Sequence, residues 1–113
     1  MTVAGYVTQD RRMTSRIPTR LDCQFSCGET SHPAVILDLS LRGAFLSSRD
    51  LPPNHSRITI TVKTPHLTKP LILAGEVVRG GMVISDHGRL NRFGVKFSDP
   101  PVNLVELIRK MIL

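Results

Sequence analysis

"LDCQFSC" at residues 21–27 alternates apolar and polar side chains along its whole length. A period of two is typical of a β-strand that has one face against a core and the other in solvent. The same period recurs in "RITITVK" at 57–63 and in "RFGVKFS" at 92–98. These stretches predict an all-β fold built from half-buried strands.

Glycine and proline divide the chain between these strands. Further strand candidates are "AVILDLS" at 34–40, "GAFLS" at 43–47 and "LILAGEVVR" at 71–79. In "GGMVISDHGR", residues 80–89, we expect two glycine turns around a short apolar piece. About six or seven short strands with such breaks predict a small antiparallel barrel or sandwich, and closure into a barrel would remove exposed sheet edges.

The C-terminal stretch "DPPVNLVELIRKMIL", residues 99–113, changes to a spacing of three and four residues. This spacing marks one face of an α-helix. Pro100 and Pro101 suit its first turn. We therefore expect one C-terminal helix that packs against the barrel through its apolar positions: Leu104, Val105, Ile108, Met111 and Ile112.

The expected core takes its aromatic and sulfur-containing side chains from these strands. We place the four phenylalanines in the core: Phe25, Phe45, Phe93 and Phe97. Cys23 and Cys27 share the apolar phase of their strand, and no second Cys/His pair follows downstream to complete a zinc site with His32. We interpret the two cysteines as small core residues and expect neither a metal site nor a cofactor.

The length and composition of the chain predict one small globular domain. The 113 residues include 41% hydrophobic and 21% charged side chains, which is ordinary for a globular protein. No apolar run approaches the roughly 20 residues of a membrane span. The N-terminal stretch is too polar for a signal peptide, so we expect a cytoplasmic protein. We expect residues 1–10 to form a flexible N-terminal segment and residues 11–113 to form a single domain.

Positive charge gathers near the N-terminus. The chain has 15 Lys and Arg against 9 Asp and Glu, a net charge of +6. Four of these charges lie within a short span: Arg11, Arg12, Arg16 and Arg20. A field of this sign favours an anionic partner such as nucleic acid, a nucleotide or an acidic membrane surface. Because "RRMTSR" at 11–16 has no folding pattern of its own, we expect this arm to become ordered when a ligand binds.

A polar cluster follows in "DLSLRGAF", residues 38–45. Asp38 and Ser40 lie two apart at the end of a strand, so we expect their side chains to project to the same face, and Gly43 follows in a turn. Each of these residues alone is a common turn former. The cluster gains meaning only beside the upstream arginines.

The two clusters together resemble the PilZ domain family. Its two signatures, R-x-x-x-R and D/N-x-S-x-x-G, are both complete and in the right order, at Arg12 and Arg16 and at Asp38, Ser40 and Gly43. The resemblance covers about residues 10–113. It implies a six-stranded antiparallel PilZ-type β-barrel that binds cyclic di-GMP through these residues.

Two further arginines join the candidate site. Arg79, at the end of "GEVVR", lies where the family sometimes uses another ligand contact, although a solvated strand end is the alternative. In PilZ proteins an arginine at the position of Arg11 tends to accompany an intercalated ligand dimer, so Arg11 would contact a second ligand molecule. Arg20 repeats the interval after Arg16, but Pro18 indicates that the extended strand has already begun.

The chemistry of cyclic di-GMP fits these residue types. The ligand offers two phosphodiester anions and two guanine edges. A guanidinium group pairs bidentately with a phosphate or with guanine O6 and N7, whereas lysine supplies only the charge. Asp38 can accept from guanine N1 and N2, Ser40 adds a small donor or acceptor, and Gly43 allows close approach.

Other functions fit the sequence less well. No G-x-S-x-G, H-E-x-x-H, P-loop or Rossmann motif occurs, so we do not expect an enzyme. A basic barrel that binds single-stranded nucleic acid would need exposed aromatics, but the chain has no Trp and one Tyr. A PilZ-like interaction module without ligand binding would have lost the arginines. The expected partners are cyclic di-GMP and a downstream protein of motility, secretion, exopolysaccharide or transcription control.

Overall fold

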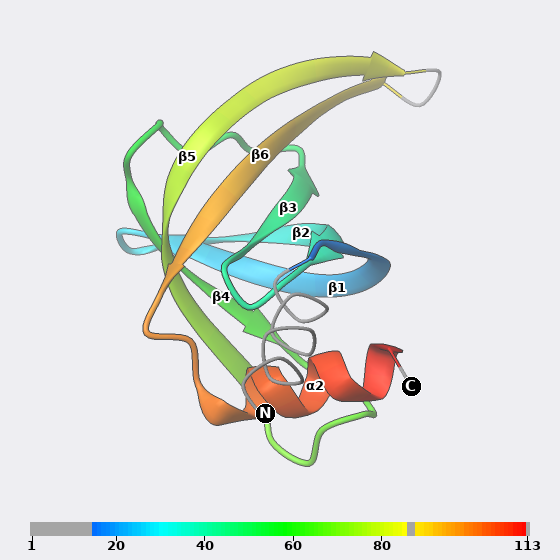
Figure 1. The fold of residues 1–113 in the computed structure, drawn as a ribbon. Coiled ribbons are helices and arrows are strands. Elements are labelled where there is room, and N and C mark those ends of the chain that lie inside the picture. Colours follow the sequence, from blue (N-terminus) through cyan, green and yellow to red (C-terminus); the bar gives the residue numbers. More distant parts are fainter. Residues whose placement is uncertain (1–14, 86–87, 113) are drawn as a thin grey trace.

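The structure, a computed structural model, describes residues 15–85 and 88–112 (Figure 1). Within these residues, six antiparallel strands close into a barrel in the order β1-β2-β3-β6-β5-β4. The elements are β1 (Ile17–Cys27), β2 (Thr30–Leu39), β3 (Gly43–Ser48), β4 (Arg57–Val62), β5 (Leu71–Ser85), β6 (Gly88–Ser98) and α2 (Val102–Ile112). The predicted six-stranded antiparallel barrel with a C-terminal helix is confirmed.

The inward-facing apolar side chains of the strands fill the barrel interior. Phe25 of β1 and Phe93 of β6 meet edge to face, with ring centroids 5.3 Å apart. The helix α2 lies across one end of the barrel (Figure 1) and buries Leu104, Leu107 and Ile108 in the same core. The outer faces of the strands are therefore left for binding.

The β5–β6 hairpin reaches well beyond the rest of the barrel (Figure 1). The expected turn at Gly80 and Gly81 was wrong, because β5 continues through both residues and pairs them with Phe93 and Arg92 of β6. Gly80 serves close packing instead: a Cβ atom there would lie 2.7 Å from Cδ1 of Leu51. The pairing of the two strands continues as far as Ser85 and Gly88, and Gly88 has a φ of 107°.

Phe45 is not a core residue, so its predicted placement was wrong. In β3 the buried side chains alternate as Ala44, Leu46 and Ser48, which turns Phe45 to the outer face, where it is half-buried. A short apolar segment such as "GAFL" does not reveal which phase faces inward, and the register of the barrel decides it.

The two cysteines differ in burial. Cys23 is 8% exposed in the core, and Cys27 is half-buried and packs against the core edge; both thiols are free. Burial, with a smaller contribution from Asp22, raises the pKa of Cys23 from 9.0 to about 12. Among the described residues, no cluster of His, Cys, Asp or Glu could hold a metal ion, and no helix is long and apolar enough to cross a membrane.

Candidate functional site

Ser40 closes the turn between β2 and β3. Its Oγ accepts hydrogen bonds from the backbone N–H groups of Arg42 at 3.1 Å and Gly43 at 3.3 Å, and its own N–H donates to the Gly43 carbonyl at 2.9 Å. The residue is 4% exposed. Ser40 therefore does not share the accessible face of Asp38, and its hydroxyl shapes the turn that follows the strand end.

Gly43 is required by the neighbouring strand. A Cβ atom at this position would collide with the carbonyl oxygen of Val95 in β6. The same turn is tied to β6 by a hydrogen bond of 2.8 Å from the Phe97 N–H to the Arg42 carbonyl. The D-x-S-x-x-G motif thus holds the β2–β3 turn against β6, and Asp38 lies at the end of β2 that leads into this turn.

Asp38 forms an ion pair with Arg16. Oδ1 of Asp38 lies 3.5 Å from Nη1 of Arg16, and the two side chains are 23% and 62% exposed. Arg16 directly precedes β1, whose Pro18 lies opposite Asp38 in β2. The first motif is therefore brought onto the second by the β1–β2 pairing. An accessible pair of this kind contributes little to stability, so both groups can exchange their partner for a ligand.

A row of four positions crosses the outer surface beside this ion pair. Asp38 of β2 lies opposite Phe45 of β3, Phe45 opposite Gly94 of β6, and Gly94 opposite Arg79 of β5. Directly opposed residues have Cβ atoms about 5 Å apart. The register therefore places the backbone position of Arg79 in one line with Asp38, although the two residues lie 41 positions apart in the sequence.

Two apolar residues at this site were missed by sequence reasoning. Phe45 presents a half-buried ring to the outer surface. Val78, which is 44% exposed, is the extra residue where the β5–β6 register shifts, and its Cγ2 would lie 3.5 Å from a Cβ atom at Gly94. The short apolar segment "GAFL" did not show which of its side chains face outward, and nothing in the sequence located the register shift at Val78.

The other candidate arginines are Arg11, Arg12, Arg79 and Arg20. Arg11 and Arg12 lie outside the described residues, and their ligand contacts stay predictions. The ligand contact of Arg79 also stays a prediction, with its backbone position now placed in the row. Arg20 is exposed and lies on the outer face of β1.

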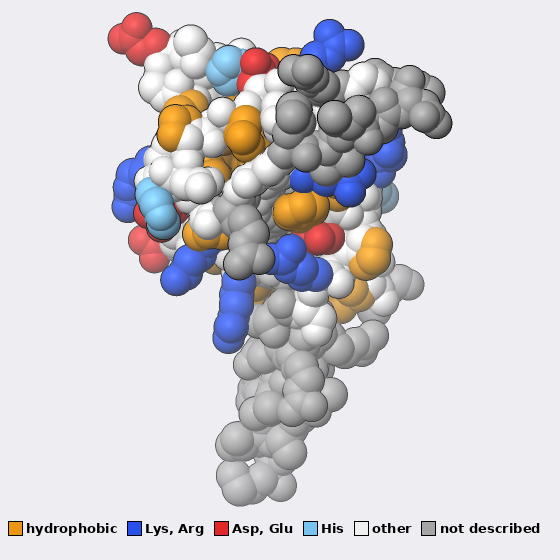
Figure 2. Space-filling view, turned by 90° about the horizontal axis from the view of Figure 1, so that it is seen from above, with side chains coloured by type: hydrophobic (Ala, Val, Ile, Leu, Met, Phe, Trp, Pro, Cys, Tyr) orange, Lys and Arg blue, Asp and Glu red, His pale blue; other side chains and the backbone are white. Residues whose placement is uncertain are grey.

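The arrangement combines three kinds of chemistry on one surface. The Asp38 carboxylate accepts hydrogen bonds, the Arg16 guanidinium donates in a planar fork, and the Phe45 ring offers an apolar face. The space-filling view shows further Lys and Arg side chains at several places around the barrel (Figure 2). Such a surface suits a planar, anionic ligand that also has hydrogen-bond donors.

The sequence matches the PilZ domain family over residues 10–113. No curated protein matches the sequence. Among solved structures, the fold is similar to the PilZ domain with c-di-GMP of YcgR from Escherichia coli, with a TM-score of 0.68 and 16% identity over 87% of this chain and 88% of that one.

Two longer proteins contain a similar barrel. The Bacillus subtilis inhibitor of motility MotI/DgrA has a TM-score of 0.68 and 13% identity over 86% of this chain and 47% of its own. The Borreliella burgdorferi PlzA protein, in complex with c-di-GMP, has a TM-score of 0.67 and 12% identity over 96% and 54%. This chain thus spans about half the length of both proteins. At these identities the likeness shows the fold.

Proposed function

Because the chain belongs to the PilZ domain family, we propose that it is a cyclic di-GMP receptor that converts ligand binding into a conformational or protein-interaction change in the cytoplasm. In this role it acts as a binding domain and not as an enzyme. Two of the similar structures, those of YcgR and PlzA, contain c-di-GMP, which supports the choice of ligand.

The observation that carries the proposal is the ion pair between Arg16 and Asp38. Its 3.5 Å separation joins the arginine of the first motif to the carboxylate of the second on an accessible surface. In the proposed complex, Asp38 accepts from guanine N1 and N2, and Arg16 turns to a phosphate or to guanine O6 and N7. Ser40 and Gly43 act by holding the strand end that presents Asp38.

Phe45 extends this site beyond the motif residues. Its half-buried ring lies beside Asp38 in the register, where a guanine paired with Asp38 can stack on it. Arg79 shares the same row and supplies a second cation. Arg12 and Arg11 belong to the preceding arm, Arg12 toward the same ligand and Arg11 toward a second ligand molecule.

The downstream target belongs to the same proposal. The similar fold of the inhibitor of motility MotI supports a downstream target that acts in motility control. Proteins of secretion, exopolysaccharide or transcription control are further candidates for this target.

Calorimetric titration of the chain with cyclic di-GMP tests the function, with GTP and cyclic di-AMP as controls. We expect saturable binding of cyclic di-GMP alone. Asp38→Ala should weaken it by about 1–3 kcal/mol, because the substitution removes both oxygens that accept from the guanine N–H groups. Glu29→Ala, which removes an exposed carboxylate at the β1–β2 turn, is the matched control and should bind as the wild type. Equal binding by Asp38→Ala would contradict the assigned site.

A further inference from the structure

A cavity lies on the outer barrel surface beside the row through Asp38 and Phe45. It has a volume of about 580 Å³ and lies over β1, β2, β3 and β6. Val35, Leu37 and Leu90 provide half-buried aliphatic side chains, and three exposed arginines line it: Arg20, Arg49 and Arg92. We call this cavity the arginine groove. Its volume is in the range of functional binding sites.

The barrel register places the arginine groove directly beside the candidate nucleotide site. Asp22 of β1 lies opposite Val35 of β2, Val35 opposite Ser47 of β3, and Ser47 opposite Arg92 of β6. This row runs parallel to the row through Asp38 and Phe45. Because Ser47 follows Phe45 by two positions on one strand, the two rows are about 7 Å apart.

The charge of the arginine groove is not compensated from within. In the part of the chain that the structure describes, the guanidinium groups of Arg20, Arg49 and Arg92 form neither ion pairs nor hydrogen bonds. Asp22 is the carboxylate among the lining residues, so three arginines and one aspartate leave a net charge of +2. Three guanidinium groups without ion pairs and a net charge of +2 around an aliphatic floor favour an anionic partner.

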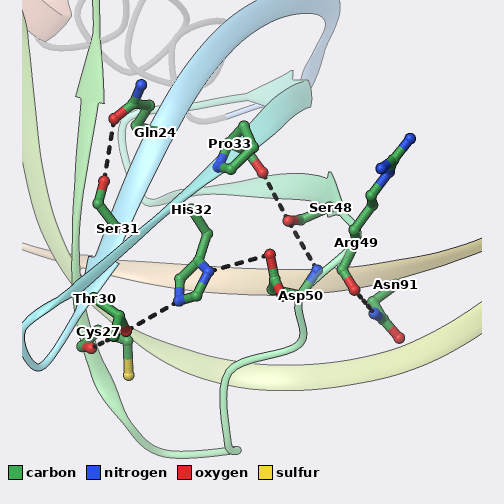
Figure 3. A network of polar contacts seen from close by, with 10 residues as sticks. All are labelled: Gln24, Cys27, Thr30, Ser31, His32, Pro33, Ser48, Arg49, Asp50 and Asn91. Atoms are coloured by element: carbon green, nitrogen blue, oxygen red, sulfur yellow. Dashed lines mark hydrogen bonds and ion pairs between the residues drawn. The ribbon is translucent and has the colours of Figure 1, made fainter.

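The position of Arg49 is held by a polar network (Figure 3). The Asn91 side chain donates to the Arg49 carbonyl at 2.8 Å, and the preceding Ser48 donates to the Pro33 carbonyl at 2.8 Å. The guanidinium of Arg49 points away from this network, as Figure 3 shows. A fixed backbone lowers the conformational cost of using this side chain in binding.

We propose that the arginine groove binds an acidic segment of a partner protein, in which carboxylates flank an aliphatic side chain. The aliphatic floor receives the apolar side chain, and the arginines pair with the carboxylates. Among the residues that the structure describes, no aromatic side chain lines the groove, and these residues therefore offer no stacking platform of the kind that single-stranded nucleic acid uses. This surface goes beyond the proposed nucleotide site and does not depend on it.

The test uses the uniformly ¹⁵N-labelled chain and an acetylated, amidated peptide of six alternating Glu and Leu residues, without cyclic di-GMP. We expect saturable shifts of the amides of Val35, Leu37 and Ser47. The same peptide with Gln in place of Glu should cause none of them. The double variant Arg20→Gln/Arg92→Gln should weaken peptide binding at least tenfold.

A matched control removes two arginines elsewhere. Arg57→Gln/Arg109→Gln changes exposed residues of β4 and α2 and lowers the net charge equally, so it should keep the peptide affinity within twofold. Equal losses in both double variants, or no saturable shift at the groove amides, would overturn the proposal. A hexathymidylate that shifts these amides at lower concentration than the peptide would also overturn it, in favour of nucleic acid.

A cyclic di-GMP titration distinguishes this proposal from the proposed function. The groove variant Arg20→Gln/Arg92→Gln should bind cyclic di-GMP as the wild type does. If it loses the nucleotide together with the peptide, the arginine groove belongs to the nucleotide site and the partner surface is refuted. If the wild type binds the peptide but no cyclic di-GMP, the proposed function fails and the partner surface stands.

Discussion

Replacing Phe45 by alanine tests whether its ring belongs to the ligand site or to the core. Phe45 lies half-buried on the outer face of β3, between the inward-facing Ala44 and Leu46. Phe93 provides the comparison, because its side chain is 0% exposed and its ring packs 5.3 Å from that of Phe25. The two substitutions remove the same atoms from opposite sides of the barrel wall.

The expected losses of stability differ severalfold. Truncating a fully buried phenylalanine costs about 3–5 kcal/mol, because it removes buried apolar area and leaves a cavity. At Phe45 water can fill the vacated space and only part of the ring was buried, so we expect a cost of about 1 kcal/mol. For a domain of this size, that lowers Tm by roughly 4–8 °C, against at least about 12 °C for Phe93→Ala.

For Phe45→Ala, the expected loss of ligand affinity is large although the expected loss of stability is small. An aromatic side chain that stacks on a base contributes about 1–3 kcal/mol. Phe45→Ala should therefore weaken cyclic di-GMP binding by about 5- to 150-fold while the protein remains folded. Thermal unfolding followed by circular dichroism measures the stability. Isothermal titration calorimetry measures the affinity at 15 °C, a temperature that lies about 25 °C below the expected melting range.

Two results would refute this reasoning separately. A loss of Tm as large as that of Phe93→Ala would show that the Phe45 ring lies in the core. Unchanged affinity at the expected Tm would remove Phe45 from the ligand site while leaving Arg16 and Asp38 in it. If Phe93→Ala does not fold, Phe93→Leu serves as the milder core reference.

Three other substitutions or modifications test the site and the fold. Gly43→Ala places a methyl group against the Val95 carbonyl and should destabilise the protein by about 1–3 kcal/mol in urea unfolding. Gly81→Ala, which has open space around its Cβ position, should be tolerated. Equal losses of stability in the two variants would refute the close approach at Gly43. Arg16→Lys keeps the charge but loses the planar fork, so calorimetry should show cyclic di-GMP binding weaker by about 1–3 kcal/mol, and wild-type affinity would indicate simple charge attraction. Because burial raises the pKa of Cys23 to about 12, its thiolate is scarce at pH 8. Ellman's reagent should therefore label this thiol only after unfolding. Rapid labelling of Cys23 in the native protein would contradict its burial.

The strands, the helix and the motif residues were predictable because their signals are local. The period of two in "LDCQFSC" and "RITITVK" follows from the alternation of side chains along one strand, and the helical spacing near the C-terminus follows from one helix face. Likewise, Asp38, Ser40 and Gly43 lie within six consecutive residues, so their spacing indicates a shared structural unit. These patterns need no knowledge of which strands are neighbours.

The accessible part of the site depended on strand register, which no local pattern encodes. Register turned Phe45 outward, extended β5 through Gly80, and aligned Asp38 with Phe45, Gly94 and Arg79 across four strands. Residues far apart in the chain meet on one face only after the barrel closes, and a shift of one residue would turn each of them to the other face. The sequence by itself determined the strands, the helix and the motif residues, whereas only the closed barrel decided which side chains form one surface.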